Sequence, residues 1–179
     1  MDELFKFDYY RMAGIPWNFS IRSFANWLLR HNIRFAFWFR FRNSHNNYIS
    51  KFACYRLSRK FGLEFSQNVR IGKGLYIGHP YNITVGDGVV MGDNINIHKG
   101  ATVGVENRGT RLGAPTIGNN VYIGINATVI GKIHIGNDVL IAPGAFVNFD
   151  VPSHSIVLGN PGKIIPRKNA TEGYIRNIV

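Results

Sequence analysis

The sequence predicts a mainly β protein: a parallel β-helix of hexapeptide repeats, preceded by a short α-helical N-terminal region. The first observation behind this prediction is a small aliphatic residue that recurs every six positions, often followed by glycine, between Phe65 and Pro152. A period of six fits neither an amphipathic helix nor an isolated strand, but it is the repeat of a parallel β-helix. The second observation is that residues 1–62 lack this period and contain all three tryptophans of the chain.

Residues 1–62 are expected to form helices that carry most of the positive charge. Ser20 is suited to cap a helix in segment 20–43, and a second helix is predicted from about Tyr48 to Phe61, where a glycine follows. The region contains eleven Lys and Arg against three Asp and Glu, in a chain whose net charge is +11.

Two interpretations of this basic, aromatic region stay open. In the first, its helices pack on the β-helix and on sister subunits. In the second, residues 1–62 contact an anionic membrane surface, with aromatic side chains in the headgroup layer. Nucleic-acid binding is not predicted, because no DNA- or RNA-binding motif accompanies the charge.

Residues 63–152 are predicted to form the β-helix itself. Each hexapeptide supplies a short strand and a corner, three of them make one triangular coil, and the aliphatic positions of successive coils stack to form the core. Gly, Asn and Asp suit the corners because they tolerate unusual backbone angles. The repeat positions, which predict about four coils, are Phe65, Ile71, Ile77, Val85, Met91, Ile97, Val103, Ile117, Ile123, Val129, Ile135, Ile141 and Val147.

The repeat is interrupted twice, and both interruptions are candidate functional segments. The first inserts two residues between Ile77 and Val85, in the stretch His-Pro-Tyr-Asn that begins at His79. The second is segment 104–116, which has lost the pattern and is expected to project as a loop. Loops on a rigid scaffold commonly carry function. Residues 153–179 are expected to form a closing loop and a C-terminal tail.

The composition limits the class of protein. The sequence has no apolar run long enough to span a membrane and no signal-peptide pattern, so we expect a cytoplasmic chain, with the inner face of the membrane as an alternative place. Cys54 is the only cysteine, which excludes an intrachain disulfide. The histidines lack the close spacing of a zinc site, so no metal is expected.

Two segments carry a family resemblance. The first, LEFSQNVRIGKGLYIGHPYNITVG, begins at Leu63, and the second, VPSHSIVLGNPGKI, begins at Val151. Both resemble the β-helix of serine acetyltransferases. The short basic, aromatic N-terminal region makes the whole chain most similar in character to bacterial exopolysaccharide and capsule O-acetyltransferases. The resemblance implies a left-handed coil, a homotrimer and acetyl-CoA as the acetyl donor.

The resemblance also implies a catalytic base and its partner. The catalytic histidine of these enzymes falls on His79, and the acidic residue fifteen positions earlier, which orients that histidine, falls on Glu64. The chemistry is reasonable independently, because an alcohol is a poor nucleophile at neutral pH and imidazole is well matched to accept its proton. A carboxylate on the other ring nitrogen would fix the tautomer.

The departures from the serine acetyltransferase pattern concern the acceptor. Those enzymes bind the carboxylate of serine with an Arg-His-Pro at the end of the loop, where this chain has Gly113, Ala114 and Pro115; an Asp precedes their catalytic histidine, where this chain has Gly78. We therefore expect a neutral acceptor, a hydroxyl of a saccharide. The alternatives are a serine O-acetyltransferase, an N-acetyltransferase for a nucleotide-linked sugar, and a β-helical scaffold without activity.

The remaining candidate residues would bind the two substrates. Candidates for acceptor contacts are His98, Asn82 and Arg111. The resemblance places the pantetheine arm of coenzyme A along Gly124, Ile125, Ala142, Pro143 and Gly144, and its phosphates near Lys163, Arg167 and Lys168.

Overall fold

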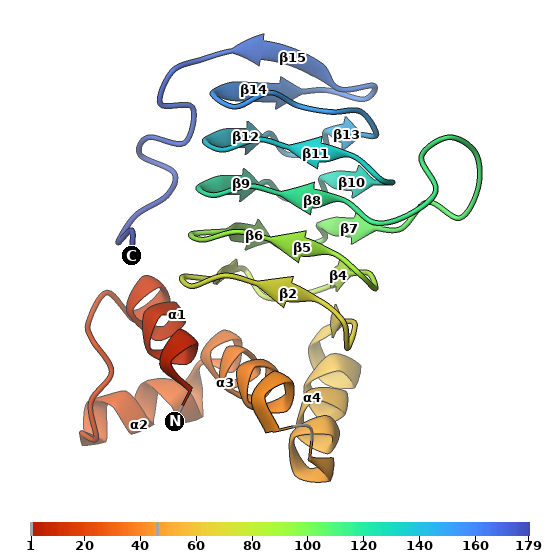
Figure 1. Cartoon of the computed structure of the whole chain (residues 1–179). Coiled ribbons are helices and arrows are strands. Elements are labelled where there is room, and N and C mark those ends of the chain that lie inside the picture. Colours follow the sequence, from red (N-terminus) through yellow and green to blue (C-terminus); the bar gives the residue numbers. More distant parts are fainter. Residues whose placement is uncertain (1, 46) are drawn as a thin grey trace.

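The computed structural model describes residues 2–45 and 47–179, and it is a three-sided parallel β-helix standing on four helices (Figure 1). This is the predicted fold class. The helices are α1 (Glu3–Ala13), α2 (Ile21–Leu29), α3 (His31–His45) and α4 (Tyr48–Phe61). The five-stranded sheet contains β1 (Leu63–Phe65), β4 (Ile83–Val85), β7 (Thr102–Gly104), β10 (Thr128–Ile130) and β13 (Phe146–Val147). The four-stranded sheet contains β2 (Arg70–Ile71), β5 (Val90–Met91), β8 (Thr116–Ile117) and β11 (His134–Ile135). The six-stranded sheet contains β3 (Tyr76–Gly78), β6 (Asn96–His98), β9 (Val121–Ile123), β12 (Val139–Ile141), β14 (Ser155–Leu158) and β15 (Lys163–Pro166).

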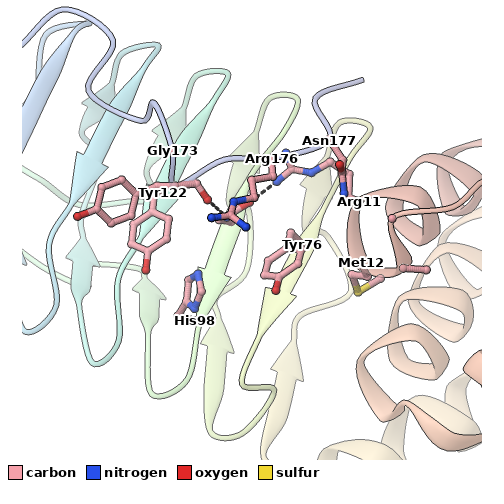
Figure 2. Close-up of a pocket in the computed structure, with 12 residues that line it drawn as sticks. Arg11, Met12, Tyr76, His98, Tyr122, Gly173, Arg176 and Asn177 are labelled. Carbon is pink, nitrogen blue, oxygen red and sulfur yellow. Dashed lines mark hydrogen bonds between the residues drawn. The ribbon is translucent and has the colours of Figure 1, made fainter.

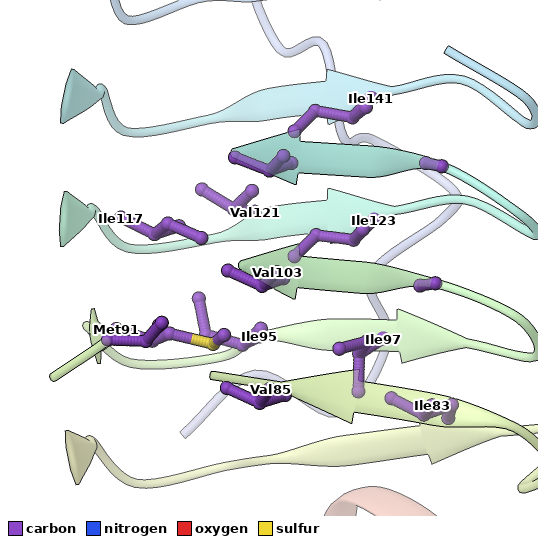
Figure 3. Close-up of a cluster of buried hydrophobic side chains, with 14 of the residues drawn as sticks. Ile83, Val85, Met91, Ile95, Ile97, Val103, Ile117, Val121, Ile123 and Ile141 are labelled. Atoms are coloured by element: carbon purple, nitrogen blue, oxygen red, sulfur yellow. The ribbon is translucent and has the colours of Figure 1, made fainter. Parts of the chain in front are cut away.

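The core of the β-helix is the stack of repeat positions. Ile97 pairs with Ile77 below it and with Ile123 above it, so the same position of the hexapeptide recurs in register from coil to coil. All of the predicted repeat positions are buried. Figure 3 shows several of these side chains, among them Val85, Ile97 and Ile123, stacked inside the prism together with other buried aliphatic residues. One hexapeptide cannot bury its aliphatic side chain alone, and the neighbouring coils supply that burial.

The β-helix has one coil more than the predicted four, because it continues past residue 152. Val151 bridges to Ile135, and β14 pairs in parallel with β12 through Leu140 and Ile156. The six-stranded sheet then ends with β15, which runs antiparallel to β14.

Two of the helices match the sequence prediction. The Ser23 N–H donates to Ser20 Oγ at 3.3 Å, which is the predicted cap of α2. Helix α4 ends at Gly62, whose left-handed φ of 67° closes the helix. No helix in the described part of the chain is long and apolar enough to cross a membrane.

The other two helices differ from the prediction. Helix α1 was not predicted, although Asp2 caps it by accepting from the Leu4 N–H at 2.8 Å. The segment 20–43 is not one helix but two, because Arg30 adopts an extended conformation between α2 and α3. No glycine or proline marks this break in the sequence.

A buried ion pair fastens the helices to the first coil. Arg40 of α3 binds both carboxylate oxygens of Asp8 of α1, at 2.8 and 3.0 Å, and donates to the carbonyls of Ile71 and Gly72. Asp8 also accepts from the Leu75 N–H at 2.8 Å. The helices therefore pack on the β-helix, as the first interpretation of residues 1–62 expected.

The C-terminal segment 167–179 runs back along the six-stranded sheet towards α1 (Figure 1). Asp138 accepts hydrogen bonds from the Thr171 N–H and hydroxyl. Further down, the Asn96 side chain donates to the Tyr174 carbonyl at 3.2 Å, and the Val179 N–H donates to the Asn94 side chain at 3.0 Å.

Candidate active site

His79 lies at a corner of the first coil, on the edge where the six-stranded and five-stranded sheets meet. Its side chain is exposed, and its backbone is left-handed, with a φ of 47°. Seven of the nine described non-glycine residues with positive φ are Asn or Asp, which tolerate this region well. The other two are His79 and His154. A histidine held in this conformation at an exposed corner is a candidate functional residue.

The edge above His79 carries the predicted pantetheine residues. A ladder of backbone hydrogen bonds climbs it, from Gly100 N–H to Tyr81 carbonyl (3.0 Å), from Asn126 to Lys99 (2.9 Å) and from Gly144 to Ile125 (2.8 Å). His79 and these backbone groups therefore lie along one line of the prism.

The predicted pantetheine residues divide into exposed and structural ones. Ile125, Pro143 and Gly144 are exposed, and a Cβ on Gly144 would meet nothing within 4 Å, so a narrow ligand has room beside this backbone. Gly124 and Ala142 are buried. A Cβ on Gly124 would lie 2.6 Å from the Pro143 nitrogen, so close stacking of the coils explains this glycine.

The three predicted phosphate contacts do not come together. Lys163 pairs with Leu158 and is at the top of the His79 edge. Strand β15 then crosses the sheet in the opposite direction, and the Arg167 N–H bonds the His154 carbonyl at 2.7 Å on the far edge. Arg167 and Lys168 are therefore separated from Lys163 by the length of β15, which runs back across the sheet after the turn at residues 159–162.

Glu64 lies on β1, opposite Thr84 of β4, with its side chain exposed. It lines a cavity of about 200 Å³ together with Arg42, Lys51 and other residues of the helical layer. The hydrogen bonds of the described residues include none between Glu64 and His79, so the predicted pair is not formed in this structure.

His98 lies one coil above His79, and the two ring centroids are 6.3 Å apart. Burial, and secondly the proximity of His79, lower the pKa of His98 to about 4, so this imidazole is neutral at physiological pH. The position of the ring depends on Gly78, because a Cβ there would overlap Cε1 and Nδ1 of His98. Of the three candidate acceptor contacts, His98 is thus the one that lies beside His79 in this structure.

Asn82 and Arg111 do not join His98 beside the base. Asn82 has a left-handed φ of 53°, its N–H bonds the Phe61 carbonyl at 3.0 Å, and its side chain covers Gly62, which is a structural explanation for this residue. Arg111 is exposed in the loop between β7 and β8, on the edge between the five-stranded and four-stranded sheets. That loop projects from the prism in Figure 1 and lies on a different edge from His79.

Sequence reasoning missed several residues near the base. His31 begins α3, its Nε2 lies 3.2 Å from the Pro80 carbonyl oxygen, and its ring stacks on Phe61 with the centroids 4.0 Å apart, so it supports the corner. A cavity of about 440 Å³ opens beside His98, and Arg11 from the unpredicted helix α1 lines it (Figure 2). No group of three His, Cys, Asp or Glu side chains within residues 2–45 and 47–179 is arranged to hold a metal ion.

Comparison with known proteins gives a consistent result. Residues 114–148 match the family model "Bacterial transferase hexapeptide (six repeats)". Serine acetyltransferase 4 of Arabidopsis thaliana is 39% identical over 110 residues, which are 62% of this chain and 31% of the plant protein. A serine acetyltransferase of Staphylococcus aureus is 34% identical over 127 residues, which are 70% of this chain and 60% of the relative. The chain thus spans about a third of the plant relative's length and less than two thirds of the bacterial one's.

Solved structures extend the similarity beyond the repeats. The serine acetyltransferase of Neisseria gonorrhoeae in complex with serine superimposes with a TM-score of 0.71 at 28% identity, covering 91% of this chain and 68% of that one. Soybean serine acetyltransferase gives a TM-score of 0.69 at 28% identity, covering 80% of this chain and 61% of that one. The chain is therefore a hexapeptide-repeat β-helix protein that is similar in sequence and fold to serine acetyltransferases.

Proposed function

We propose that the chain is an acetyl-CoA-dependent O-acetyltransferase and that His79 is its general base. The observation that carries this proposal is the exposed, left-handed His79 at the foot of an edge whose backbone stays open at Ile125 and Gly144. A base at this place can reach a hydroxyl group presented beside the edge. The similarity to serine acetyltransferases supports the same chemistry.

The proposed reaction is a direct transfer. The imidazole of His79 takes the proton of the acceptor hydroxyl as that oxygen attacks the thioester carbonyl, and the proton then passes to the leaving thiolate. No covalent enzyme intermediate is required. Neutral His98 offers a second polar contact beside the base, since its Nε2 has no hydrogen-bond partner in the described part of the chain. Glu64 stays the proposed orienting carboxylate, although the single chain does not bring it into hydrogen-bond contact.

Acetyl-CoA is proposed to lie along the His79 edge. The exposed backbone at Pro143 and Gly144 has space for the pantetheine arm, and Lys163 at the top of the edge offers a cation for a phosphate. Arg167 and Lys168 are on the far edge and are less suited to the same ligand.

Two acceptors have separate support. The relatives and solved structures reported above are serine acetyltransferases, which favours serine. A saccharide hydroxyl is favoured by the loss of charged residues at Gly113 and Ala114, and by the place of Gly78, where any larger side chain would collide with His98. We propose serine-type hydroxyl acetylation as the first activity to test and a saccharide acceptor as the second.

A homotrimer would complete the site. The loop with Arg111 and the base His79 lie on different edges of one prism. In a ring of three parallel prisms, the loop of one copy can approach the His79 edge of its neighbour. We propose this arrangement, which would also place Arg111 close to the substrates.

The test is an acetyl-transfer assay that follows the release of free coenzyme A with L-serine, free sugars and oligosaccharides as acceptors. The proposal expects release that depends on one of these acceptors and that is lost in His79→Asn. No release above that without protein, or equal release by the variant, would favour the alternative of a β-helical scaffold.

The helical layer supports a surface contact in addition to catalysis. Apolar side chains of α2 and α4 are open to solvent, among them Ile21 (90% exposed), Leu29 (77%) and Ile49 (70%). With the basic charge of residues 1–62, they suit either an anionic membrane or a sister subunit. Flotation with vesicles containing a phosphatidylserine fraction separates the two: Ile21→Ser/Leu29→Ser should lose flotation if the partner is a membrane, and wild type should not float if the partner is a subunit.

A further inference from the structure

A cavity of about 440 Å³ lies where α1, the six-stranded sheet and the C-terminal segment meet (Figure 2). In that view, aromatic and histidine side chains rise from the strands on one side, and Arg11 reaches in from α1 on the other. The residues that define its chemistry are Arg11, Tyr76, His98, Tyr122, Tyr174 and Arg176.

Arg11 is a buried cation without a matching anion. Its side chain is 3% exposed, and one nitrogen, Nη2, donates to the Asn96 side chain. Its Nε and Nη1 atoms have no partner, and no salt bridge joins it to any carboxylate of the described residues. The carboxylate of Asp8 is one turn earlier on α1, but both of its oxygens accept hydrogen bonds from Arg40.

The charge state of Arg11 is not in question. Burial lowers the pKa of its guanidinium to about 10, against the opposing effect of Asp8, so the group remains a cation at neutral pH. A buried charge with unsatisfied donors is costly unless an anion accepts from it. Two nitrogens of the charged guanidinium group therefore lie in the cavity wall with no acceptor from the described residues.

The rest of the cavity wall likewise carries no acidic side chain. Arg176 lines it from the C-terminal segment, and none of the lining residues is Asp or Glu. The Nε2 atom of His98 also lacks a partner. Tyr122 and Tyr174 stand with their ring centroids 5.1 Å apart and supply flat walls with hydroxyl groups. The cavity therefore offers cations and neutral hydrogen-bonding groups but no negative charge.

We propose that this cavity binds a small ligand through an anionic group, a carboxylate or a phosphate, held by Arg11 and Arg176. Guanidinium groups match the geometry of both anions and form strong charge-assisted hydrogen bonds with them. The volume is within the range of small-molecule sites. Since the His98 ring lines the cavity and lies 6.3 Å from the ring of His79, the bound ligand would border the proposed base.

Two kinds of ligand would carry the anionic group that this cavity binds. It is either part of the acceptor whose hydroxyl reaches His79, or a separate effector that occupies the cavity next to the reaction. Both require the same binding chemistry, and the binding itself does not depend on the proposed transferase activity.

Calorimetric titration of the full chain without acetyl-CoA tests the binding. The probes are L-serine, D-glucuronate and inorganic phosphate, with L-serinamide and D-glucose as matched compounds that lack the anion. We expect saturable binding of at least one anion, weakened about tenfold or more in Arg176→Gln, because a hydrogen bond to a charged group contributes about 1.5–3 kcal/mol. Arg176 is exposed, so this variant should fold as wild type does.

The matched control is Arg167→Gln, which removes the same charge from the same C-terminal segment but outside the cavity. Its affinity should stay within about twofold of wild type. Arg11→Gln, checked for folding by circular dichroism, should also lose the anion. The proposal is overturned if no anion binds better than its uncharged counterpart, or if both cavity variants bind as tightly as wild type.

Kinetics then separate the two sources. If the anion belongs to the acceptor, Arg176→Gln raises the KM for L-serine or glucuronate and leaves that for the uncharged counterpart unchanged. If it belongs to an effector, the variant leaves the acceptor KM unchanged and abolishes the effect of added phosphate on the rate. A failed transferase assay with successful titration would contradict the proposed function but not the anion site.

Discussion

Replacing His79 with asparagine separates the catalytic role of this residue from its structural one. The His79 backbone is left-handed at φ 47°, a conformation that costs an ordinary L-residue about 1 kcal/mol and that asparagine adopts more readily. The exposed imidazole makes no hydrogen bond within the described part of the chain, and its ring centroid lies 6.3 Å from that of His98. His79→Asn should therefore fold as well as wild type or gain up to about 1 kcal/mol, which corresponds to about 2–4 °C in Tm for a chain of this size.

The turnover of His79→Asn should fall, although its stability should not. Loss of a general base typically costs about 100-fold or more in rate. The two measurements are differential scanning calorimetry and the release of free coenzyme A on the same preparation. His154→Asn is the control, because His154 has a similar φ of 59° but lies on the far edge of the prism, so its activity should stay at the wild-type level. Turnover of His79→Asn within about threefold of wild type would refute the role of His79, and a fall of several degrees in Tm would refute the structural reasoning.

Three further outcomes are expected. Asp8→Asn should lower the free energy of unfolding by about 3–5 kcal/mol, measured by urea denaturation, because it leaves a buried arginine unpaired, whereas Glu3→Gln in the exposed pair at the start of the same helix should change it by less than about 1 kcal/mol. Gly78→Ala should displace the His98 ring, at a cost of about 1–3 kcal/mol, and lower turnover, so an active variant with unchanged stability would contradict this contact. Burial raises the pKa of Asp138, but hydrogen bonds from the C-terminal segment and a neighbouring histidine outweigh it and hold the pKa below the usual 3.8. The anchoring of this segment is therefore complete above pH 3.8 and is lost as the pH falls through the lower folded-state value, which amide hydrogen exchange between pH 5 and pH 3 should detect in wild type but not in Asp138→Asn.

The fold could be predicted from the repeat because the stacking of its aliphatic residues depends only on the sequence of the neighbouring repeats. A buried aliphatic residue at every sixth position has only one way to stack on its neighbours, so Ile77, Ile97 and Ile123 fall in register without any information from elsewhere in the chain. The reversal at β15 and the helix break at Arg30 were not predictable in the same way. No glycine or proline marks the break at Arg30. The stretch Gly-Asn-Pro-Gly at 159–162 does signal a turn before β15, but the strand to which β15 returns depends on what that segment packs against.

The candidate site likewise combines residues whose positions follow from the repeat with residues whose positions do not. His79 and the residues of its edge follow from the repeat, because a corner residue of one coil must lie below the corner of the next. The place of Arg11 in the site could not be predicted from its local sequence. It belongs to a helix that the sequence analysis did not predict, and the strand residue Asn96 that it contacts lies 85 positions away. The pocket beside the base is thus assembled from three distant parts of the chain.

The arginines in this pocket bear on the choice between a charged and a neutral acceptor. The sequence predicted a neutral acceptor because the positions that bind the carboxylate of serine in the resembling enzymes are Gly113 and Ala114 here. That inference assumes that the positive charge must come from the same loop. Arg11 and Arg176 line a cavity next to His98 from two other segments, so the loss of charge in the loop does not by itself exclude an anionic acceptor. The comparison of L-serine with L-serinamide is therefore the measurement on which the choice between serine and a neutral sugar depends.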